Sequence, residues 1–418
     1  MTVRRDYVAL AGGQLGLAAV NVAVGFLLAR VATPATVGQW FFVSSLAQLG
    51  VAFTIGGVGP EVVRRLGIER VSPSSVARSA FRALVASLAL VLAVVLIPGG
   101  WAIATSVSGP RPERLPWIAA CLIVALLFLR AGVEFARGIL RIDLATMLNG
   151  WFDRGLLAVG LAVALAASLT LSLTDVVAVQ LAGIAVAGAV TLPRLRSAWR
   201  RTPGGDVDAG FRWADTHRLT ASIVLQRVVM LGDIVLGAFF LSATELAQYG
   251  IALRVAALVA LPVRAATMVA LPHLSRGRLD GASAQSTIGS VVKLSSALSG
   301  VIVIGLIFLG RPLLEIGFGS EYVDALPLIA VLAGSQLVNS LTGPSHAALI
   351  VEHHDGVVMR HAAIGASLLV GGCWIASLIG TAPALAAFSA LATVVQQLLS
   401  WNAARRLCGV RTDVFSSR

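Results

Sequence analysis

The chain has 418 residues, of which 57% are hydrophobic and only 12% are charged, and its mean hydropathy is +0.88. Soluble globular domains carry about 25% charged residues, so this composition excludes a soluble domain. The net charge of +12 would suit a nucleic-acid-binding protein, but the basic residues gather in alternate loops between apolar stretches, so we expect no nucleic-acid partner.

Apolar stretches long enough to cross a bilayer recur along the whole chain. We expect an all-α integral membrane protein, because a helix satisfies its own backbone hydrogen bonds in lipid. Twelve spans are predicted, at 8–30, 39–63, 80–102, 115–136, 151–171, 175–193, 219–241, 248–271, 288–309, 324–350, 359–380 and 383–404.

The distribution of charge predicts the topology. An even number of spans places both termini on the same side of the membrane. The loops and ends on that side hold about 25 basic residues, whereas the opposite loops hold only Arg30, Arg111, Arg114 and Arg311. Cytoplasmic loops carry the excess of basic residues, so both termini are predicted to be cytoplasmic.

An internal repeat divides the chain. TPATVGQW (33–40) resembles SATELAQY (242–249) at an offset of 209 residues, and Asp6 corresponds to Asp215 at the same offset. Proline, glycines and mixed charges mark 194–218 as a cytoplasmic linker. We therefore predict two lobes of six spans each, 1–205 and 206–418.

The second span ends in a glycine-rich run, Gly56 to Arg65, that contains Pro60. No strand precedes this run and no GK[ST] follows it, so it does not have the features of a phosphate-binding loop. The run instead predicts a kink at Pro60 and close packing of helices.

The seventh span carries two charges, Arg227 and Asp233. They are six residues apart, which turns them about 120° away from each other on a helix. Each charge therefore needs a partner elsewhere. A charge near mid-membrane costs about 2.5–3.5 kcal/mol on insertion scales, so both residues are candidates for function.

Further polar residues occur inside the predicted spans. In the fourth span Glu134 can pair with Arg130 or Arg137, which share its helical face. The other candidates are Gln14 and Asn21 in the first span, Arg30 at its end, Arg254 and Arg264 in the eighth, and Asn339 and His346 around Gly343–Pro344 in the tenth. Small polar residues either hold helices together or line a path, and the sequence leaves both roles open.

Catalytic and metal-binding signals are weak. Lys293 is the only lysine, which excludes a P-loop ATPase and leaves little room for a Schiff-base enzyme. The cysteines, Cys121, Cys373 and Cys408, show no metal-binding spacing. The external loops are too short to hold a catalytic domain. We expect a protein that is not an enzyme and has no catalytic residue, cofactor or metal site.

Several stretches resemble a known family. They are 29–65 (ARVATPATVGQWFFVSSLAQLGVAFTIGGVGPEVVRR), 231–255 (LGDIVLGAFFLSATELAQYGIALRV), 270–276, 311–332 and 343–355. Their order and spacing resemble the polysaccharide biosynthesis transporters, which are flippases for lipid-linked oligosaccharides of the O-antigen type. These flippases belong to the multidrug/oligosaccharidyl-lipid/polysaccharide (MOP) exporter superfamily. Gln248 departs from the family pattern, which has a glycine there.

The resemblance implies two pseudo-symmetric six-helix bundles that form a V around a central cavity, as in multidrug and toxin extrusion (MATE) transporters. It also implies a flippase that moves an undecaprenyl-pyrophosphate-linked oligosaccharide across the bacterial inner membrane by alternating access. The expected partners are the lipid-linked glycan, membrane lipids, and a glycan polymerase and glycosyltransferases.

The predicted cavity is built from charged and polar residues. Substrate contacts are assigned to Arg30, Arg130, Arg227, Arg254 and Arg264, charge partners to Asp233 and Glu134, and polar lining to Gln14, Asn21, Asn339 and His346. A proton or sodium gradient or the membrane potential would drive transport.

Three alternatives stay open: a multidrug or cation antiporter of the same superfamily, an integral-membrane glycosyltransferase, and a scaffold for cell-wall assembly. Basic residues outnumber acidic ones inside the predicted spans, which favours an anionic cargo over a cationic one.

Overall fold

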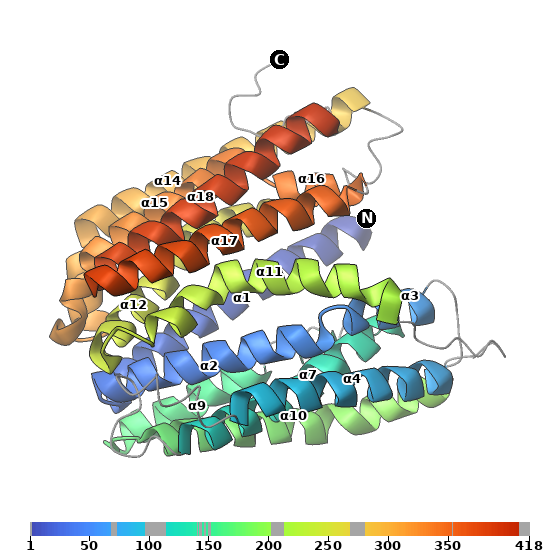
Figure 1. Cartoon of the computed structure of the whole chain (residues 1–418), viewed down its shortest axis with the longest axis horizontal. Coiled ribbons are helices and arrows are strands. Elements are labelled where there is room, and N and C mark those ends of the chain that lie inside the picture. Colours follow the sequence, from blue (N-terminus) through green and yellow to red (C-terminus); the bar gives the residue numbers. More distant parts are fainter. Residues whose placement is uncertain are drawn as a thin grey trace. The chain divides into compact units, whose positions relative to one another are not determined.

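The computed structural model describes residues 2–67, 73–96, 114–139, 141, 144–145, 148, 152–201, 213–267, 281–352 and 354–408. Within these ranges every regular element is a helix (Figure 1). The prediction of an all-α protein is confirmed.

The helices follow one another along the chain with short connections. The first half contains α1 (Thr2–Val31), α2 (Pro34–Ile55), α3 (Val58–Gly67), α4 (Pro73–Leu96), α7 (Leu115–Gly138), α9 (Phe152–Ala166) and α10 (Leu173–Arg201). The second half contains α11 (Trp213–Gly237), α12 (Ala243–Ala256), η3 (Ala257–Ala260), α14 (Gly281–Gly317), η4 (Ser320–Ala325), α15 (Leu326–Thr342), α16 (Ser345–Val351), α17 (Asp355–Ile379) and α18 (Ala382–Leu407).

Local sequence explains where several helices begin and end. Thr33 caps α2, because its side chain accepts a hydrogen bond from the Thr36 amide, and Pro34 occupies the first turn. Gly380 ends α17 in the left-handed conformation, with φ of +71°, which glycine adopts without steric strain. Thr381 and Pro383 then begin α18.

The second predicted span is bent by 47° between α2 and α3, and the break lies at Gly56–Gly57. Pro60 has no amide hydrogen to bond the carbonyl of residue 56, and its ring would clash with that carbonyl in a regular helix. The kink that the sequence predicts at Pro60 is therefore displaced by one turn toward the N-terminus.

Nine helices among the described residues are long and apolar enough to cross a membrane, and the bent pair of α2 and α3 can be counted as a tenth. Two shorter apolar helices, Ala19–Val31 and Arg154–Ala166, lie in the first and fifth predicted spans. The chain is a multi-pass membrane protein. Each predicted span contains a helix, and the number of crossings stays a prediction.

The chain packs as two units. The N-terminal unit is Arg30–Thr244, and the C-terminal unit is Met1–Ala29 with Glu245–Arg418. These units differ from the predicted lobes, 1–205 and 206–418, in the placement of two helices. Almost all of α1 packs with the second half of the chain, and α11 packs with the first half, against α2.

The predicted linker 194–218 is helical at both of its ends. Residues 194–201 continue α10, and 213–218 begin α11, whereas 202–212 lie outside the described residues. The extension of α10 is fixed to α7 by Trp199, whose ring lies 5.3 Å from that of Phe135.

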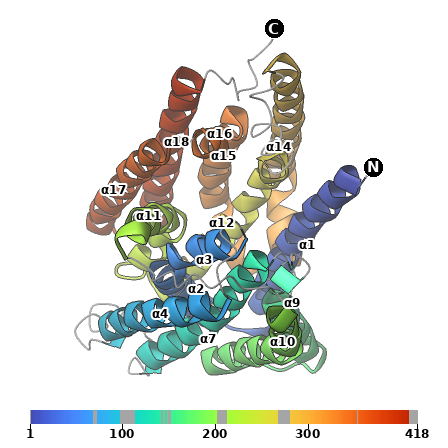
Figure 2. The same ribbon diagram turned by 90° about the vertical axis from the view of Figure 1, so that its right-hand side faces the viewer.

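Helices run side by side within each unit. In the N-terminal unit α2 packs against α4, α7, α10 and α11, and α9 packs against α10. In the C-terminal unit α18 packs against α15, α16 and α17, and α14 packs against α15 (Figures 1 and 2).

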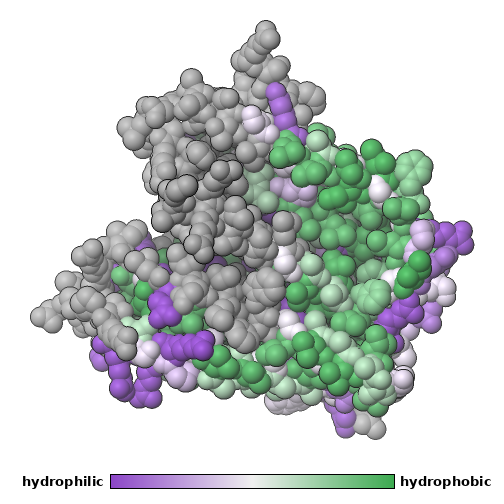
Figure 3. Space-filling view, turned by 180° about the vertical axis from the view of Figure 1, so that it is seen from behind, coloured by the Kyte–Doolittle hydropathy of each residue, from purple (hydrophilic) through white to green (hydrophobic). Residues whose placement is uncertain are grey.

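The surface of these helices is suited to lipid. Hydrophobic residues cover most of the described surface in Figure 3, and hydrophilic ones gather toward the edges of that view. Large apolar side chains stay exposed, among them Phe308 (77%) on α14 and Leu378 (76%) on α17. Apolar patches of this extent are rare on soluble monomers, whereas acyl chains can cover them in a membrane.

A close contact between α17 and α18 provides a test of the packing. A Cβ atom at Gly372 would lie 2.5 Å from Phe388 Cβ, whereas a Cβ atom at Gly371 meets no atom within 4 Å. We expect Gly372→Ala to lower the free energy of unfolding by about 1–3 kcal/mol, because the added methyl group overpacks the contact. Thermal unfolding in detergent measures the effect, with Gly371→Ala as the control. Equal midpoints for the two variants would contradict this packing.

Candidate functional site

The two packing units separate the predicted site residues. The N-terminal unit contains Arg30, Arg130, Glu134, Arg227 and Asp233, and the C-terminal unit contains Asn21, Arg254, Arg264, Asn339 and His346. The side chain of Gln14 lies outside the described residues.

Arg254 connects α12 to α1 in the C-terminal unit. Its Nη1 donates a hydrogen bond of 2.8 Å to the backbone carbonyl of Asn21. The aliphatic part of Arg254 lies against Gly25, where an added Cβ would be 3.3 Å from Arg254 Cδ. Edge-to-face contact of Phe26 with Phe318, with centroids 6.2 Å apart, supports the same end of α1. In this conformation Arg254 therefore holds α1 in place.

The eighth predicted span is irregular just after Arg254. The helix tightens to a 3-10 turn at η3, which frees backbone carbonyls. The carbonyl of Val259 accepts a hydrogen bond of 2.7 Å from Ser299 Oγ on α14, which lies 2.9 Å from Ser340 Oγ on α15. Ser296 Oγ donates to the Ser340 carbonyl at 2.8 Å. Three buried serines thus connect η3, α14 and α15.

The tenth predicted span is broken at Gly343–Pro344, between α15 and α16. Gly343 has φ of +64°, and Ser345 Oγ donates to the carbonyl of Thr342 at 2.8 Å. Asn339 lies one turn before the break and is half-buried. His346 lies just after it, and its Nε2 is buried without a hydrogen-bond partner among the described residues. The polar patch predicted here therefore surrounds an interrupted helix.

In the N-terminal unit Glu134 pairs with Arg137, one of its two predicted partners. Arg137 Nη1 lies 2.9 Å from Glu134 Oε1. Glu134 also contacts α3, because a Cβ atom at Gly59 would lie 2.8 Å from Glu134 Cγ. Glu61 on α3 has its own partners, Arg64 and Arg65, each at 2.6 Å.

The two charges of α11 have different environments. Asp233 is 1% exposed, and its Oδ1 accepts a hydrogen bond from the backbone amide of Ile234 at 2.9 Å. Arg227 is exposed and forms no hydrogen bond or ion pair with any residue that the structure describes. The predicted divergence of the two side chains is consistent with these environments.

Of the other arginines, Arg30 and Arg264 are exposed and Arg130 is half-buried.

A buried polar group in the N-terminal unit is missing from the predicted site. The guanidinium of Arg154 on α9 lies 5.7 Å from the ring centroid of Trp40 on α2. Trp40 Nε1 donates to Gln180 Oε1 on α10 at 3.4 Å. Arg154 and Gln180 also lie in apolar predicted spans. Polar residues inside a span are candidates for function, so the argument made for Arg227 applies to them equally.

Metal binding finds no support in the described ranges. No three side chains of His, Cys, Asp or Glu lie close enough there to hold a metal ion.

Comparison with known proteins gives the family and the fold. The family model for polysaccharide biosynthesis proteins matches residues 27–327. The structure is similar to the lipid II flippase MurJ in its inward closed conformation, with a TM-score of 0.74 at 10% identity, over 95% of this chain and 87% of that one. No curated protein sequence matches this chain.

Two transporters of the MOP superfamily also have similar structures. An inward-facing multidrug resistance MATE transporter has a TM-score of 0.69 at 14% identity, over 97% of this chain and 100% of that one. A MOP superfamily transporter from Pyrococcus furiosus, described as having a binding pocket of reverse polarity, has a TM-score of 0.61 at 15% identity, over 96% and 94% of the two chains. At these identities the likeness concerns the fold.

The serine network yields a stability prediction. Ser299→Ala removes the hydroxyl that satisfies Val259 and leaves this carbonyl without its partner. We expect the free energy of unfolding to fall by about 1–3 kcal/mol. Ser295→Ala is the matched control, because Ser295 Oγ bonds only to Val292 on its own helix. Unfolding midpoints in detergent distinguish the variants, and an unchanged midpoint for Ser299→Ala would refute the role of the network.

Proposed function

The chain belongs to the polysaccharide biosynthesis protein family, and on this premise we propose that it is a flippase for an undecaprenyl-pyrophosphate-linked oligosaccharide. It would act by alternating access in the bacterial inner membrane, with both termini in the cytoplasm. The fold that it shares with a lipid II flippase supports this proposal.

The chemistry of such a cargo explains why arginines would lie in the spans. An oligosaccharide pyrophosphate is polar and anionic and cannot enter hydrocarbon, whereas its lipid tail can stay in the bilayer. A guanidinium group donates paired hydrogen bonds that fit phosphate oxygens.

The observation that carries the proposal is Arg227. It lies in an apolar helix, is exposed, and has no partner among the described residues. A cation placed there is unfavourable unless it has an anionic ligand or water. Of the five arginines assigned to the cavity, Arg227 is therefore the one most available to a pyrophosphate in the described part of the chain.

We assign the remaining charged and polar residues to lining the path, gating it or balancing its charge. Arg30, Arg130 and Arg264 line the path, and Arg254 acts as a gate, because releasing its bond to Asn21 would free α1. Asp233 and Glu134 balance these charges, and Gln14, Asn339 and His346 are polar lining. A proton or sodium gradient or the membrane potential drives the cycle. A glycan polymerase and glycosyltransferases would act on either side of it.

A second candidate is a multidrug or cation antiporter, supported by the similar fold of MATE transporters. A cation site needs carboxylate groups, and Asp233 on α11 supplies a buried carboxylate. Export of a cationic dye from the same proteoliposomes, without movement of the glycan, would favour this candidate. Sugar transfer by the purified protein would instead favour a glycosyltransferase.

Arg227→Gln tests the flippase proposal. We expect glycan flipping at subsaturating substrate to fall by about tenfold or more, because one charged hydrogen bond contributes about 1.5–3 kcal/mol. The measurement is movement of a fluorescent undecaprenyl-pyrophosphate oligosaccharide in proteoliposomes. Arg311→Gln is the control, since exposed Arg311 pairs with Glu315 at 2.9 Å. Equal rates for wild type and Arg227→Gln, at equal protein levels, would sink the proposal.

A further inference from the structure

Two histidines lie on neighbouring helices of the C-terminal unit. His346 belongs to α16 and His361 to α17, and these two helices pack against each other. His361 is 4% exposed, and its Nδ1 lies 3.2 Å from Ser400 Oγ on α18. The site therefore joins three helices.

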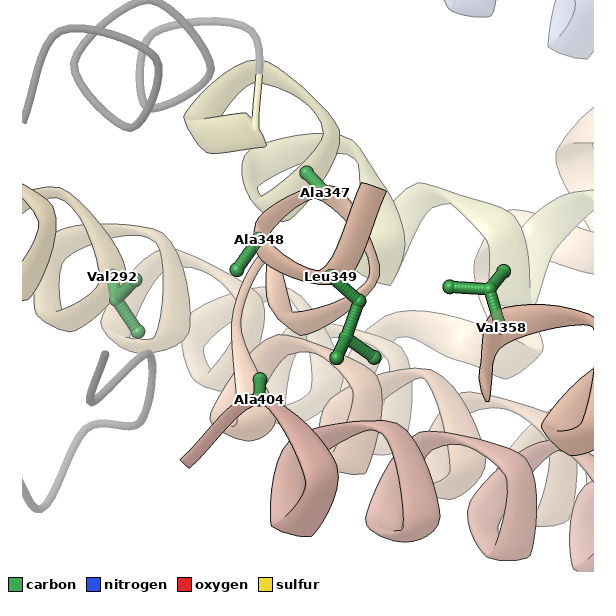
Figure 4. Close-up of a cluster of buried hydrophobic side chains, with 6 residues drawn as sticks. All are labelled: Val292, Ala347, Ala348, Leu349, Val358 and Ala404. Atoms are coloured by element: carbon green, nitrogen blue, oxygen red, sulfur yellow. The ribbon is translucent and has the colours of Figure 1, made fainter. Parts of the chain in front are cut away.

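An apolar cluster lies on the helices that carry these histidines. Figure 4 shows its buried side chains, which are Ala347, Ala348 and Leu349 on α16, Val358 on α17 and Ala404 on α18, together with Val292 on α14. Ala347 follows His346, Val358 is one turn before His361, and Ala404 is one turn after Ser400. His361 is buried, whereas His346 is half-buried with its Nε2 atom shielded from solvent.

His346 lacks a hydrogen bond that its chemistry calls for. A neutral imidazole has one donor and one acceptor nitrogen. Nε2 of His346 is buried and has no partner among the described residues. A buried polar atom in this state costs about 1–3 kcal/mol, so water or a proton reaching His346 would relieve an existing penalty.

The helix that carries His346 is short and is bounded by a break or a turn at each end. α16 has only seven residues, with the Gly343–Pro344 break before it and a turn to α17 after it, where the His354 amide bonds the Leu349 carbonyl at 2.8 Å. Interrupted helices are a recurrent feature of transporter binding sites. A small rotation of α16 would separate His346 from its apolar contacts.

We propose that His346 and His361 form a proton-binding site, and that a proton bound there favours a conformation in which α16 admits water to the pair. This rests on the proposed transport function, to which it adds the coupling ion and its site. A buried imidazolium is unfavourable, and a second positive charge beside it more so. Proton uptake thus becomes linked to opening.

Other charged groups lie on the elements around the pair. They are Arg360 and Asp355 on α17, Glu352 and His354 after α16, Arg405 and Arg406 on α18, and Lys293 on α14. α15 has no charged residue. The field of Arg360 reaches His361. None of the carboxylates makes a hydrogen bond to either ring within the described residues.

Cys408 is a native reporter of the position of α16. Its Sγ lies 3.9 Å from the carbonyl of Ala348, and the residue is half-buried. Burial, together with the charge of Glu352, raises the pKa of the Cys408 thiol above its ordinary value. Movement of α16 would expose this thiol, and its rate of alkylation would then rise.

The experiment uses the full chain in proteoliposomes without glycan, with Cys121→Ser and Cys373→Ala so that Cys408 is the only thiol. Maleimide labelling is measured from pH 8 to pH 6. Each rate is divided by the rate for the same protein unfolded in detergent, which removes the effect of thiol ionisation. We expect this ratio to rise as the pH falls, by up to about tenfold per pH unit for one linked proton. A constant ratio in the wild-type histidine background would overturn the proposal.

Substitutions then assign the effect to the pair. His346→Gln and His361→Gln should each abolish the pH dependence of the ratio, whereas His354→Gln should retain it. If all three variants keep the pH dependence, the pair is not the site. Glycan flipping in the same vesicles separates the two proposals. Flipping with a constant ratio overturns only the proton site, and a pH-dependent ratio without flipping overturns only the flippase.

Discussion

A backbone inside a bilayer has no water to bond, so every interruption of a helix must be satisfied by the protein itself. The C-terminal unit meets this constraint with hydroxyl groups. Ser299 bonds the carbonyl that η3 leaves free, and Ser345 bonds the Thr342 carbonyl at the break before α16. These short bonds allow two irregular helices to persist next to each other, and polar side chains gather around them.

The arginines of the spans fall into two groups under the same constraint. Arg254 uses its guanidinium to bind the main chain of α1, and Arg154 lies over the ring of Trp40. Both contribute to the packing of their own unit. Arg227 makes no such contact with the described residues. The difference between an arginine that holds helices together and one that can hold a ligand is therefore visible in its partners, although both look alike in the sequence.

Hydropathy and charge were sufficient to predict the apolar helices, the polar residues around Gly343–Pro344 and the pairing of Glu134 with a neighbour on its own helix, whereas the helix break at Gly343–Pro344 was not predicted. These features depend on residues close together in the sequence. The 3-10 turn at η3 could not be predicted, because its residues, ALVA, are as apolar as a regular helix. The packing of α1 with the second half of the chain, and the contact of Arg154 with Trp40, depend on contacts between residues more than 100 positions apart, which periodicity does not report.

The bond from Arg254 to α1 ends on a carbonyl and not on a side chain. Every amino acid has a backbone carbonyl, so any residue at position 21 that keeps the helix regular can accept this bond. The contact therefore tolerates changes of residue 21, whereas any side chain larger than hydrogen at position 25 would press on Arg254, whose Cδ lies 3.3 Å from an added Cβ. Among distant relatives we expect the residues at positions 25 and 254 to change together, whereas residue 21 varies independently of them.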